Sequence, residues 1–212
     1  MANNKFNKME FWNSQLTEKS WRLLQEIRKK YNFILIGGWS TYLWTKQQKS
    51  KDIDIVVSLT ELQKLKQEDL RKNDALKKYE IKSDEIDIDI YLEYYSKLTI
   101  PPEDIKKYTS QIEGFNVASQ EALLVLKQGA EIDRENSIKG EKDRADIVSL
   151  MLFANPDYNA YLKILKEYSK EEYFHRLVKI LKDFREYNIV GLSPKEFKSK
   201  KEKTLEQLKK VK

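Results

Sequence analysis

Residues 33–57, FILIGGWSTYLWTKQQKSKDIDIVV, constrain the fold of this chain more than any other stretch. The stretch opens with an apolar run of β-forming residues, which is the pattern of a strand buried on both faces. Gly37 and Gly38 end that run, and residues 40–46 have a helical composition. We therefore expect the backbone N–H groups of a helix start just past the end of the strand. Such groups form a ready site for a phosphate.

Aspartate alternates with isoleucine in two predicted strands, first at Asp52 and Asp54 and again at Asp87 and Asp89. Because successive side chains of a strand point to opposite faces, each pair of aspartates shares one face. The alternative interpretation is a solvated strand face, but such a face carries mixed polar residues, and aspartate is depleted in strands. Carboxylates this close repel one another, and a cation between them relieves the repulsion; oxygen ligands suit magnesium or manganese. A phosphate site beside a carboxylate pair is what magnesium–nucleotide chemistry needs.

The order of these motifs resembles the DNA polymerase β-type nucleotidyltransferase superfamily. It is most similar to the stand-alone minimal branch, which includes toxin-like nucleotidyltransferases of abortive-infection systems. The superfamily signature is a hydrophobic residue and Gly, then Gly or Ser, a spacer, and Asp-hydrophobic-Asp-hydrophobic. Here the matching segments are Ile36-Gly37-Gly38, the thirteen residues 39–51, and Asp52-Ile53-Asp54-Ile55. The third carboxylate strand, a helix with a lysine and a later helix with an aspartate are matched by residues 85–90, 119–127 and 142–147, so the resemblance covers about residues 30–153.

The resemblance implies a set of catalytic and metal-binding carboxylates. Asp52 and Asp54 would hold the metal ion that bridges the β- and γ-phosphates of a nucleoside triphosphate. They would share a second metal ion with a third carboxylate, which completes the metal site and assists as general base. Spacing does not decide between Asp87 and Asp89 for that third carboxylate, because both face the same way; we favour Asp89.

The resemblance also implies a set of nucleotide-binding residues, namely Gly37, Gly38, Ser40, Lys127 and Asp146. Three of them have simpler interpretations. Ser40 would only cap a helix, Lys127 would be a surface lysine at a helix end, and Asp146 would form ion pairs with Lys142 and Arg144 on its own helix. We keep the nucleotide-binding interpretation for all three because the resemblance favours it.

The expected function is therefore transfer of a nucleoside monophosphate from an NTP to an acceptor hydroxyl, with release of pyrophosphate. The expected cofactor is Mg²⁺ or Mn²⁺. An aminoglycoside-like small molecule, a tRNA 3′ end and a protein side chain would all suit such a site as acceptors. The alternative is a non-catalytic nucleic-acid- or protein-binding module, such as a toxin–antitoxin component, that retains the fold.

Composition excludes several other classes of protein. No run of eighteen apolar residues occurs, and the first residues lack the apolar region of a signal peptide, so we expect a cytoplasmic protein without a membrane span. The absence of cysteine excludes disulfides, thiolate nucleophiles and zinc ribbons. A charged fraction of 35% favours a thermophilic source.

Positive charge is concentrated at the C-terminus. Residues 193–212 hold eight lysines and three glutamates, so they supply +5 of the net charge of +6. This basic tail would attract RNA electrostatically. Because acidic residues are interleaved with the lysines, the alternative interpretation of a solvated helix face is favoured.

The periodicity predicts an α/β (α+β) fold: a polymerase β-type nucleotidyltransferase domain, with a mixed sheet and flanking helices, followed by a C-terminal helical domain. We expect the first domain over residues 1–118, including an N-terminal helix, and the second over residues 119–212. Strands are expected at 33–36, 52–57, 79–82, 85–92 and 108–117. Helices are expected at 9–31, 40–46, 59–73, 119–130, 139–154, 156–168, 170–187 and 194–211, with a short one starting at 101–104.

Overall fold

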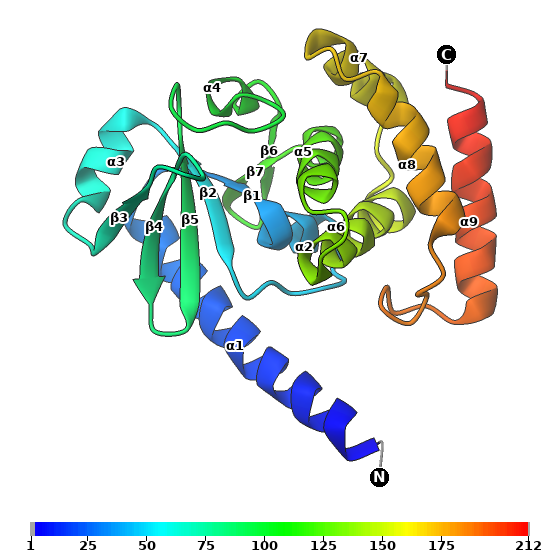
Figure 1. The fold of residues 1–212 in the computed structure, drawn as a ribbon, viewed down its shortest axis with the longest axis horizontal. Coiled ribbons are helices and arrows are strands. Elements are labelled where there is room, and N and C mark those ends of the chain that lie inside the picture. The colour runs from blue at the N-terminus through cyan, green and yellow to red at the C-terminus, as the bar shows by residue number, and fades with distance from the viewer. Residues whose placement is uncertain (1–2, 212) are drawn as a thin grey trace.

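The computed structural model describes residues 3–211, and it describes the side chains of residues 15–211. Over that part of the chain the strands form one mixed sheet of seven strands in the order β3-β4-β5-β2-β1-β7-β6 (Figure 1). The pairs β2–β5 and β1–β7 are parallel, and the other neighbours are antiparallel. The strands are β1 (Ile34–Ile36), β2 (Ile53–Val57), β3 (Leu70–Asn73), β4 (Lys78–Ser83), β5 (Ile86–Leu92), β6 (Thr109–Ile112) and β7 (Phe115–Ala118). The expected mixed α/β fold is confirmed.

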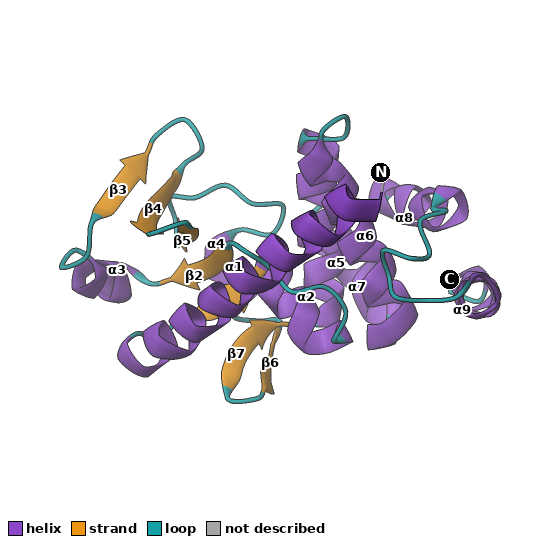
Figure 2. Ribbon diagram, turned by 90° about the horizontal axis from the view of Figure 1, so that it is seen from below, coloured by secondary structure: helices purple, strands orange, loops and turns teal. Residues whose placement is uncertain are grey.

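Helices lie against the sheet and beyond one end of it. The long helix α1 crosses one face of the sheet, whereas α5 to α9 gather on the other side of the molecule (Figures 1 and 2). The helical elements are α1 (Asn3–Lys30), α2 (Gly37–Thr45), α3 (Leu59–Leu65), α4 (Pro102–Ile105), α5 (Gln120–Asp133), α6 (Ile138–Ser149), the π-helical segment η1 (Leu150–Ala154), α7 (Tyr158–Glu167), α8 (Glu172–Asp183) and α9 (Pro194–Lys209).

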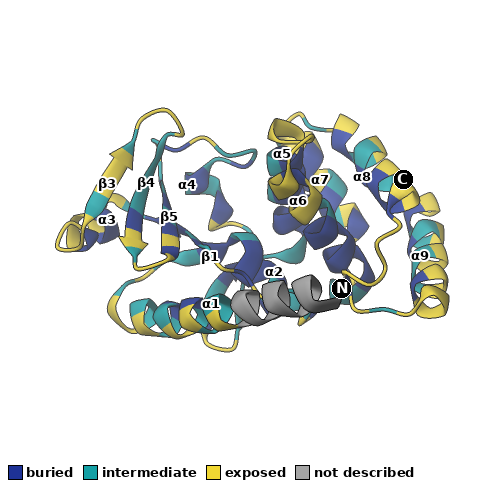
Figure 3. Cartoon of the chain, turned by 60° about the horizontal axis from the view of Figure 1, so that its bottom comes forward, coloured by how far each residue is buried: buried dark blue, intermediate teal, exposed yellow. Residues whose placement is uncertain are grey.

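The alternation in β2 divides its side chains between two cores. Ile53 and Ile55 are buried with Leu24 of α1 in one cluster. Val56 belongs to a second cluster with the apolar side chains of α5 to α9. Figure 3 shows the resulting buried interior along α2, α5 and α6. Asp54 shares its face with Val56, so the sequence period alone directs this carboxylate toward the helical side of the sheet.

Helix α1 packs against α2 through residues in its second half. The indole N–H of Trp39 in α2 donates to the hydroxyl of Ser20 at 2.8 Å, and both residues are fully buried. Trp21 packs on Trp39 with their ring centroids 5.0 Å apart. These contacts hold the second half of α1 against α2, whereas Phe11 and Trp12 lie outside the residues with described side chains.

Three expected elements differ from the structure in more than their bounds. The helix expected over residues 59–73 ends at Leu65, and its last four residues form β3, which pairs with β4 at the sheet edge. The single strand expected over residues 108–117 is the hairpin β6–β7, because Glu113 and Gly114 both adopt positive φ and turn the chain. The helix expected over residues 139–154 continues past Ser149 as the π-helical η1.

The basic tail forms α9, which begins with a capping box at Ser193 and buries Phe197 and Leu208. Two of its lysines contact other elements. Lys200 donates to the carbonyl of Leu152 in η1, and Lys201 donates to the carbonyls of Lys182 and Phe184 at the end of α8. These lysines therefore satisfy carbonyls at helix ends that have no intrahelical partner. The RNA contact of the tail and the domain boundary at residue 118 stay predictions.

Over the residues that the structure describes, no helix is both long enough and apolar enough to cross a membrane.

Candidate active site

A cleft of about 640 Å³ opens between the sheet and the helices α5 and α6. It is lined by the turn from β1 into α2, by β2, β4 and β5, by α5 and α6, and by residues 97–99 of the loop after β5. Of the nine residues expected from the sequence to act in the site, six line this cleft. They are Gly37, Gly38, Asp52, Asp54, Asp89 and Lys127.

The two glycines bring the backbone close to the carboxylates. Gly37 has a φ of +66°, and a Cβ placed on it would lie 2.1 Å from Oδ2 of Asp54. A Cβ on Gly38 would lie 2.5 Å from the hydroxyl oxygen of Ser50. Only glycine fits both positions. Helix α2 begins here, and its N-cap residue Ile36 has no side-chain acceptor for the first N–H groups, which leaves them for an anion.

Strand pairing brings together the carboxylates of two predicted strands. β2 and β5 are parallel, and their register places Asp54 directly beside Asp89. Asp52 lines the cleft just before β2 begins. Asp87 shares the face of Asp89 but is exposed and is not part of the cleft lining. The geometry therefore selects Asp89 over Asp87 as the carboxylate nearest the first pair.

Negative charge accumulates at Asp54. Burial, followed by repulsion from Asp89, raises the pKa of Asp54 to about 6, and Lys127 and Lys142 offset only part of that rise. The ordinary value for this carboxyl is 3.8. A raised pKa means that the ionised form is the unfavourable one in this environment. A divalent cation at this point would relieve the same repulsion.

Lys78 forms ion pairs with Asp89 and with Glu80. Nζ of Lys78 lies 2.7 Å from Oδ2 of Asp89 and 3.1 Å from Oε1 of Glu80. Burial alone would lower the pKa of Lys78, but hydrogen bonding and attraction to Asp89 raise it above its ordinary value. Over the residues that the structure describes, no three His, Cys, Asp or Glu side chains converge into a group that could hold a metal ion. The expected three-carboxylate metal site is thus not formed as the side chains lie here.

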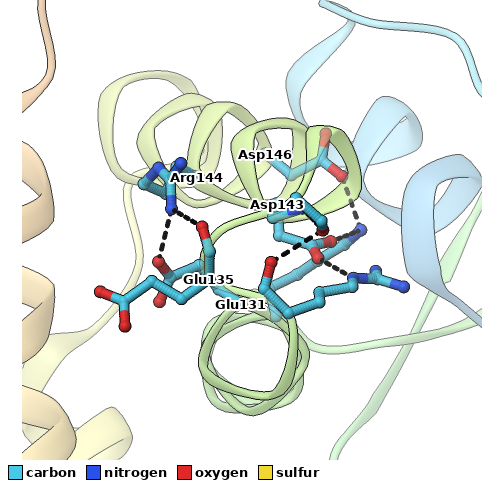
Figure 4. Close-up of polar contacts among 9 residues, drawn as sticks. Glu131, Glu135, Asp143, Arg144 and Asp146 are labelled. Carbon is cyan, nitrogen blue, oxygen red and sulfur yellow. Dashed lines mark hydrogen bonds and ion pairs between the residues drawn. The ribbon is translucent and has the colours of Figure 1, made fainter.

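Helices α5 and α6 form the opposite wall of the cleft through buried ion pairs. Nζ of Lys127 lies 2.6 Å from Oδ2 of Asp146 and 3.2 Å from Oδ1 of Asp143. The other oxygen of Asp143 binds Nε of Arg134 at 2.6 Å. Figure 4 shows Asp143 and Asp146 extending from α6 toward these partners. Lys127 is therefore a buried lysine on the cleft wall, not the surface lysine of the simpler interpretation.

These carboxylates keep Lys127 charged. Burial would lower the pKa of Lys127, but the carboxylates of Asp146 and Asp143 outweigh it and raise the pKa above its ordinary value. Asp146 does not line the cleft and is 2% exposed. Its geometry suits a residue that positions Lys127, and a direct contact with a nucleotide would require it to be exposed.

Ser40 also lies away from the cleft. It is fully buried within α2, and its hydroxyl has no hydrogen-bond partner among the described residues. The expected phosphate contact needs an exposed hydroxyl, so this placement opposes it. Ser50, which sequence reasoning passed over, is the serine of the cleft, and Nζ of Lys142 lies 3.4 Å from its hydroxyl.

Sequence reasoning also missed Lys78, Tyr91 and Arg134 in the cleft lining. The sequence could have placed Tyr91 in the cleft, because the alternation of Asp87 and Asp89 continues to Tyr91 and places it on the same strand face. Burial, with the charges of Asp54 and Asp89, raises the pKa of its phenol well above the ordinary value. Lys78 and Arg134 carried no comparable pattern, since Asp89 and Asp143, which they bind in the cleft, lie on other elements.

Neither a known protein family nor a curated protein matches the sequence. Solved structures do match. A "putative nucleotidyltransferase" from Helicobacter pylori is 17% identical with a TM-score of 0.46, over 92% of this chain and 96% of that one. A second one, from Thermotoga maritima, is 20% identical with a TM-score of 0.42, over 60% of this chain and 91% of that one. An antigenic nucleotidyltransferase-like protein from Paracoccidioides brasiliensis is 16% identical with a TM-score of 0.38, over 66% of this chain and 76% of that one.

At such identities and TM-scores the likenesses carry no argument about family or activity. The function proposed below therefore rests on the residues of the cleft.

Proposed function

We propose that this protein is a metal-dependent nucleotidyltransferase that transfers a nucleoside monophosphate from an NTP to an acceptor hydroxyl. One observation carries the proposal. The glycine pair, the aspartate pair and Lys127 come from three separate segments of the chain, and all line a single cleft. The cleft volume of about 640 Å³ is within the range of ordinary small-molecule sites.

The phosphates of the nucleotide have a matching set of donors on the chain. The first N–H groups of α2 belong to Gly37 and Gly38, which line the cleft and have no side-chain cap from Ile36. Lys127 and Lys142 add two ammonium groups from the helical wall. Anionic phosphate would thus meet a helix N-terminus on one side and fixed positive charge on the other.

The donor chemistry of the aspartate pair fits magnesium or manganese. Asp52 and Asp54 offer only carboxylate oxygens, and burial, followed by repulsion from Asp89, raises the pKa of Asp54 despite the nearby lysines. Asp52 and Asp54 would hold the ion, which when bound would neutralise phosphate charge. This is the cofactor chemistry that the cleft supports.

The reaction follows from these placements. The acceptor oxygen forms a bond to the α-phosphorus, and the bond from that phosphorus to the bridging oxygen of pyrophosphate breaks. The hydroxyl proton passes to Asp89, which lies beside Asp54 on the next strand. Negative charge that develops on the leaving pyrophosphate faces Lys127 and the start of α2.

Calorimetry tests the proposal. We would titrate non-hydrolysable analogues of each NTP into the protein with EDTA, Mg²⁺ or Mn²⁺, for the wild type and for Asp52→Asn combined with Asp54→Asn. We expect binding that depends on the metal ion and that the double variant loses. Asp87→Asn is the matched control, since Asp87 lies on the same strand face outside the cleft, and its binding should equal that of the wild type.

Absence of NTP binding under every metal condition would refute the enzyme assignment. Once binding is established, labelled NTPs incubated with candidate small molecules, tRNA and proteins would identify the acceptor.

A further inference from the structure

The lysine among the sheet carboxylates occupies a fixed position. Lys78 begins β4, and its side chain is only 12% exposed between Asp89 and Glu80. Pairing of β4 with β5 places Glu80 directly opposite Asp89 and holds the start of β4 beside them. The ammonium is therefore part of the sheet framework. It differs from the solvated lysines that cover the rest of the surface.

The carboxylates near Lys78 form a row across three strands. Glu80 of β4 is paired with Asp89 of β5, and Asp89 is paired with Asp54 of β2. Asp54 is the end of the row that lies against Gly37. Lys78 contacts the row one strand further from the glycines, at Asp89 and Glu80.

On the sheet side of the cleft, two carboxylates are left for a metal ion. Among the described residues, neither Asp52 nor Asp54 forms an ion pair, whereas Asp89 is engaged by Lys78. A second divalent cation bound by Asp89 would lie beside the ammonium of Lys78, which is 2.7 Å from Oδ2 of the same carboxylate. The ammonium and this cation are both positive, and two like charges this close repel strongly in a partly buried site.

Resting on the proposed function, we propose that Lys78 takes the place of the acceptor-side metal ion, so that each nucleotide binds with one divalent cation. As the acceptor oxygen bonds to the α-phosphorus and the bond to pyrophosphate breaks, its proton moves to Asp89. Lys78 keeps its own protons throughout. Its positive charge beside Asp89 stabilises the negative charge that develops on the attacking oxygen.

The test counts metal ions. We would titrate Mn²⁺ calorimetrically into the protein saturated with a non-hydrolysable NTP analogue, for the wild type, Lys78→Met and Lys78→Arg. The control is Lys82→Met, because Lys82 lies on the same strand and face, is exposed, and is paired in register with Asp87 outside the cleft. Thermal melts in EDTA establish that each variant is folded before it is titrated.

We expect one Mn²⁺ per chain for the wild type, Lys78→Arg and Lys82→Met. Lys78→Met should bind a second Mn²⁺, at least about tenfold tighter than any weak second event in the wild type, because the competing charge is gone. Two Mn²⁺ ions in the wild type would overturn the inference and leave the proposed function standing, and so would unchanged stoichiometry in folded Lys78→Met. Absence of any Mn²⁺–nucleotide complex in the wild type would instead overturn both.

Discussion

The charge concentrated at Asp54 should make the protein less stable than its fold allows when no metal is bound. We predict that Asp54→Asn stabilises the metal-free protein at alkaline pH. The native pKa of about 6, against an ordinary value of 3.8, is a difference of roughly two units. At about 1.4 kcal/mol per unit, the ionised carboxylate costs the native state on the order of 3 kcal/mol. For a chain of this size that corresponds to a rise in Tm of about 6 to 12 °C.

The sign of the pH dependence follows from the direction of the shift. Because the native pKa lies above the unfolded value, the native state binds a proton more readily than the unfolded state does. The penalty is therefore complete above pH 7, falls as the pH drops through 6, and vanishes near pH 4. Asparagine carries no charge, so the stability difference between the variant and the wild type should shrink over the same range.

Urea denaturation in EDTA at pH 8, 6 and 4.5 would measure this difference. Asp87→Asn provides the control, because Asp87 is exposed on the neighbouring strand and its loss should leave stability within a few tenths of a kcal/mol. If Asp54→Asn were no more stable than the wild type at pH 8, or more stable by the same amount at every pH, the electrostatic reasoning would be wrong. In saturating Mg²⁺ and NTP analogue, the wild type should instead be more stable than Asp54→Asn, because only the wild type gains binding energy.

Two further predictions concern the walls of the cleft. Lys127→Met should leave Asp143 and Asp146 buried without their shared cation. We expect it to lower the free energy of unfolding, measured by urea denaturation, by about 3 to 5 kcal/mol. A loss below about 1 kcal/mol would show that the ion pairs contribute little to stability. Gly37→Ala should abolish NTP-analogue binding in calorimetry, because its Cβ would overlap Asp54. A folded Gly37→Ala variant that binds as the wild type does would contradict the close packing of this turn.

The sequence predicted the central part of this fold well. Alternation in β2 and β5 is a local signal, and it was sufficient to place Asp54 and Asp89 on matching strand faces. The glycine turn into α2 was equally predictable from the sequence, although the helix begins at Gly37 itself and not at Ser40. Local patterns determine such elements because the residues that form them are adjacent in the chain.

Features that depend on distant partners were not predictable in the same way. Residues 70–73 continue a helical pattern, yet they form β3 because β4 offers a sheet edge. The burial of Lys127 was not predictable, because its partners Asp143 and Asp146 come from α6. The pairing of Lys78 with Asp89 joins two strands of a hairpin, and only the register reveals it.

Helix α2 has a consequence for how the chain unfolds. On one side Trp39 and Leu43 belong to the core beneath the sheet, and on the other side Trp44 packs against the helical core and donates its indole N–H to the carbonyl of Ala118 at 2.9 Å. Figure 1 shows α2 between the sheet and the helices α5 and α6. Neither core can therefore melt without exposing one side of this helix. The chain should unfold as one cooperative unit, and a fragment ending near residue 118 would lose the cover of the helix that carries the glycine turn.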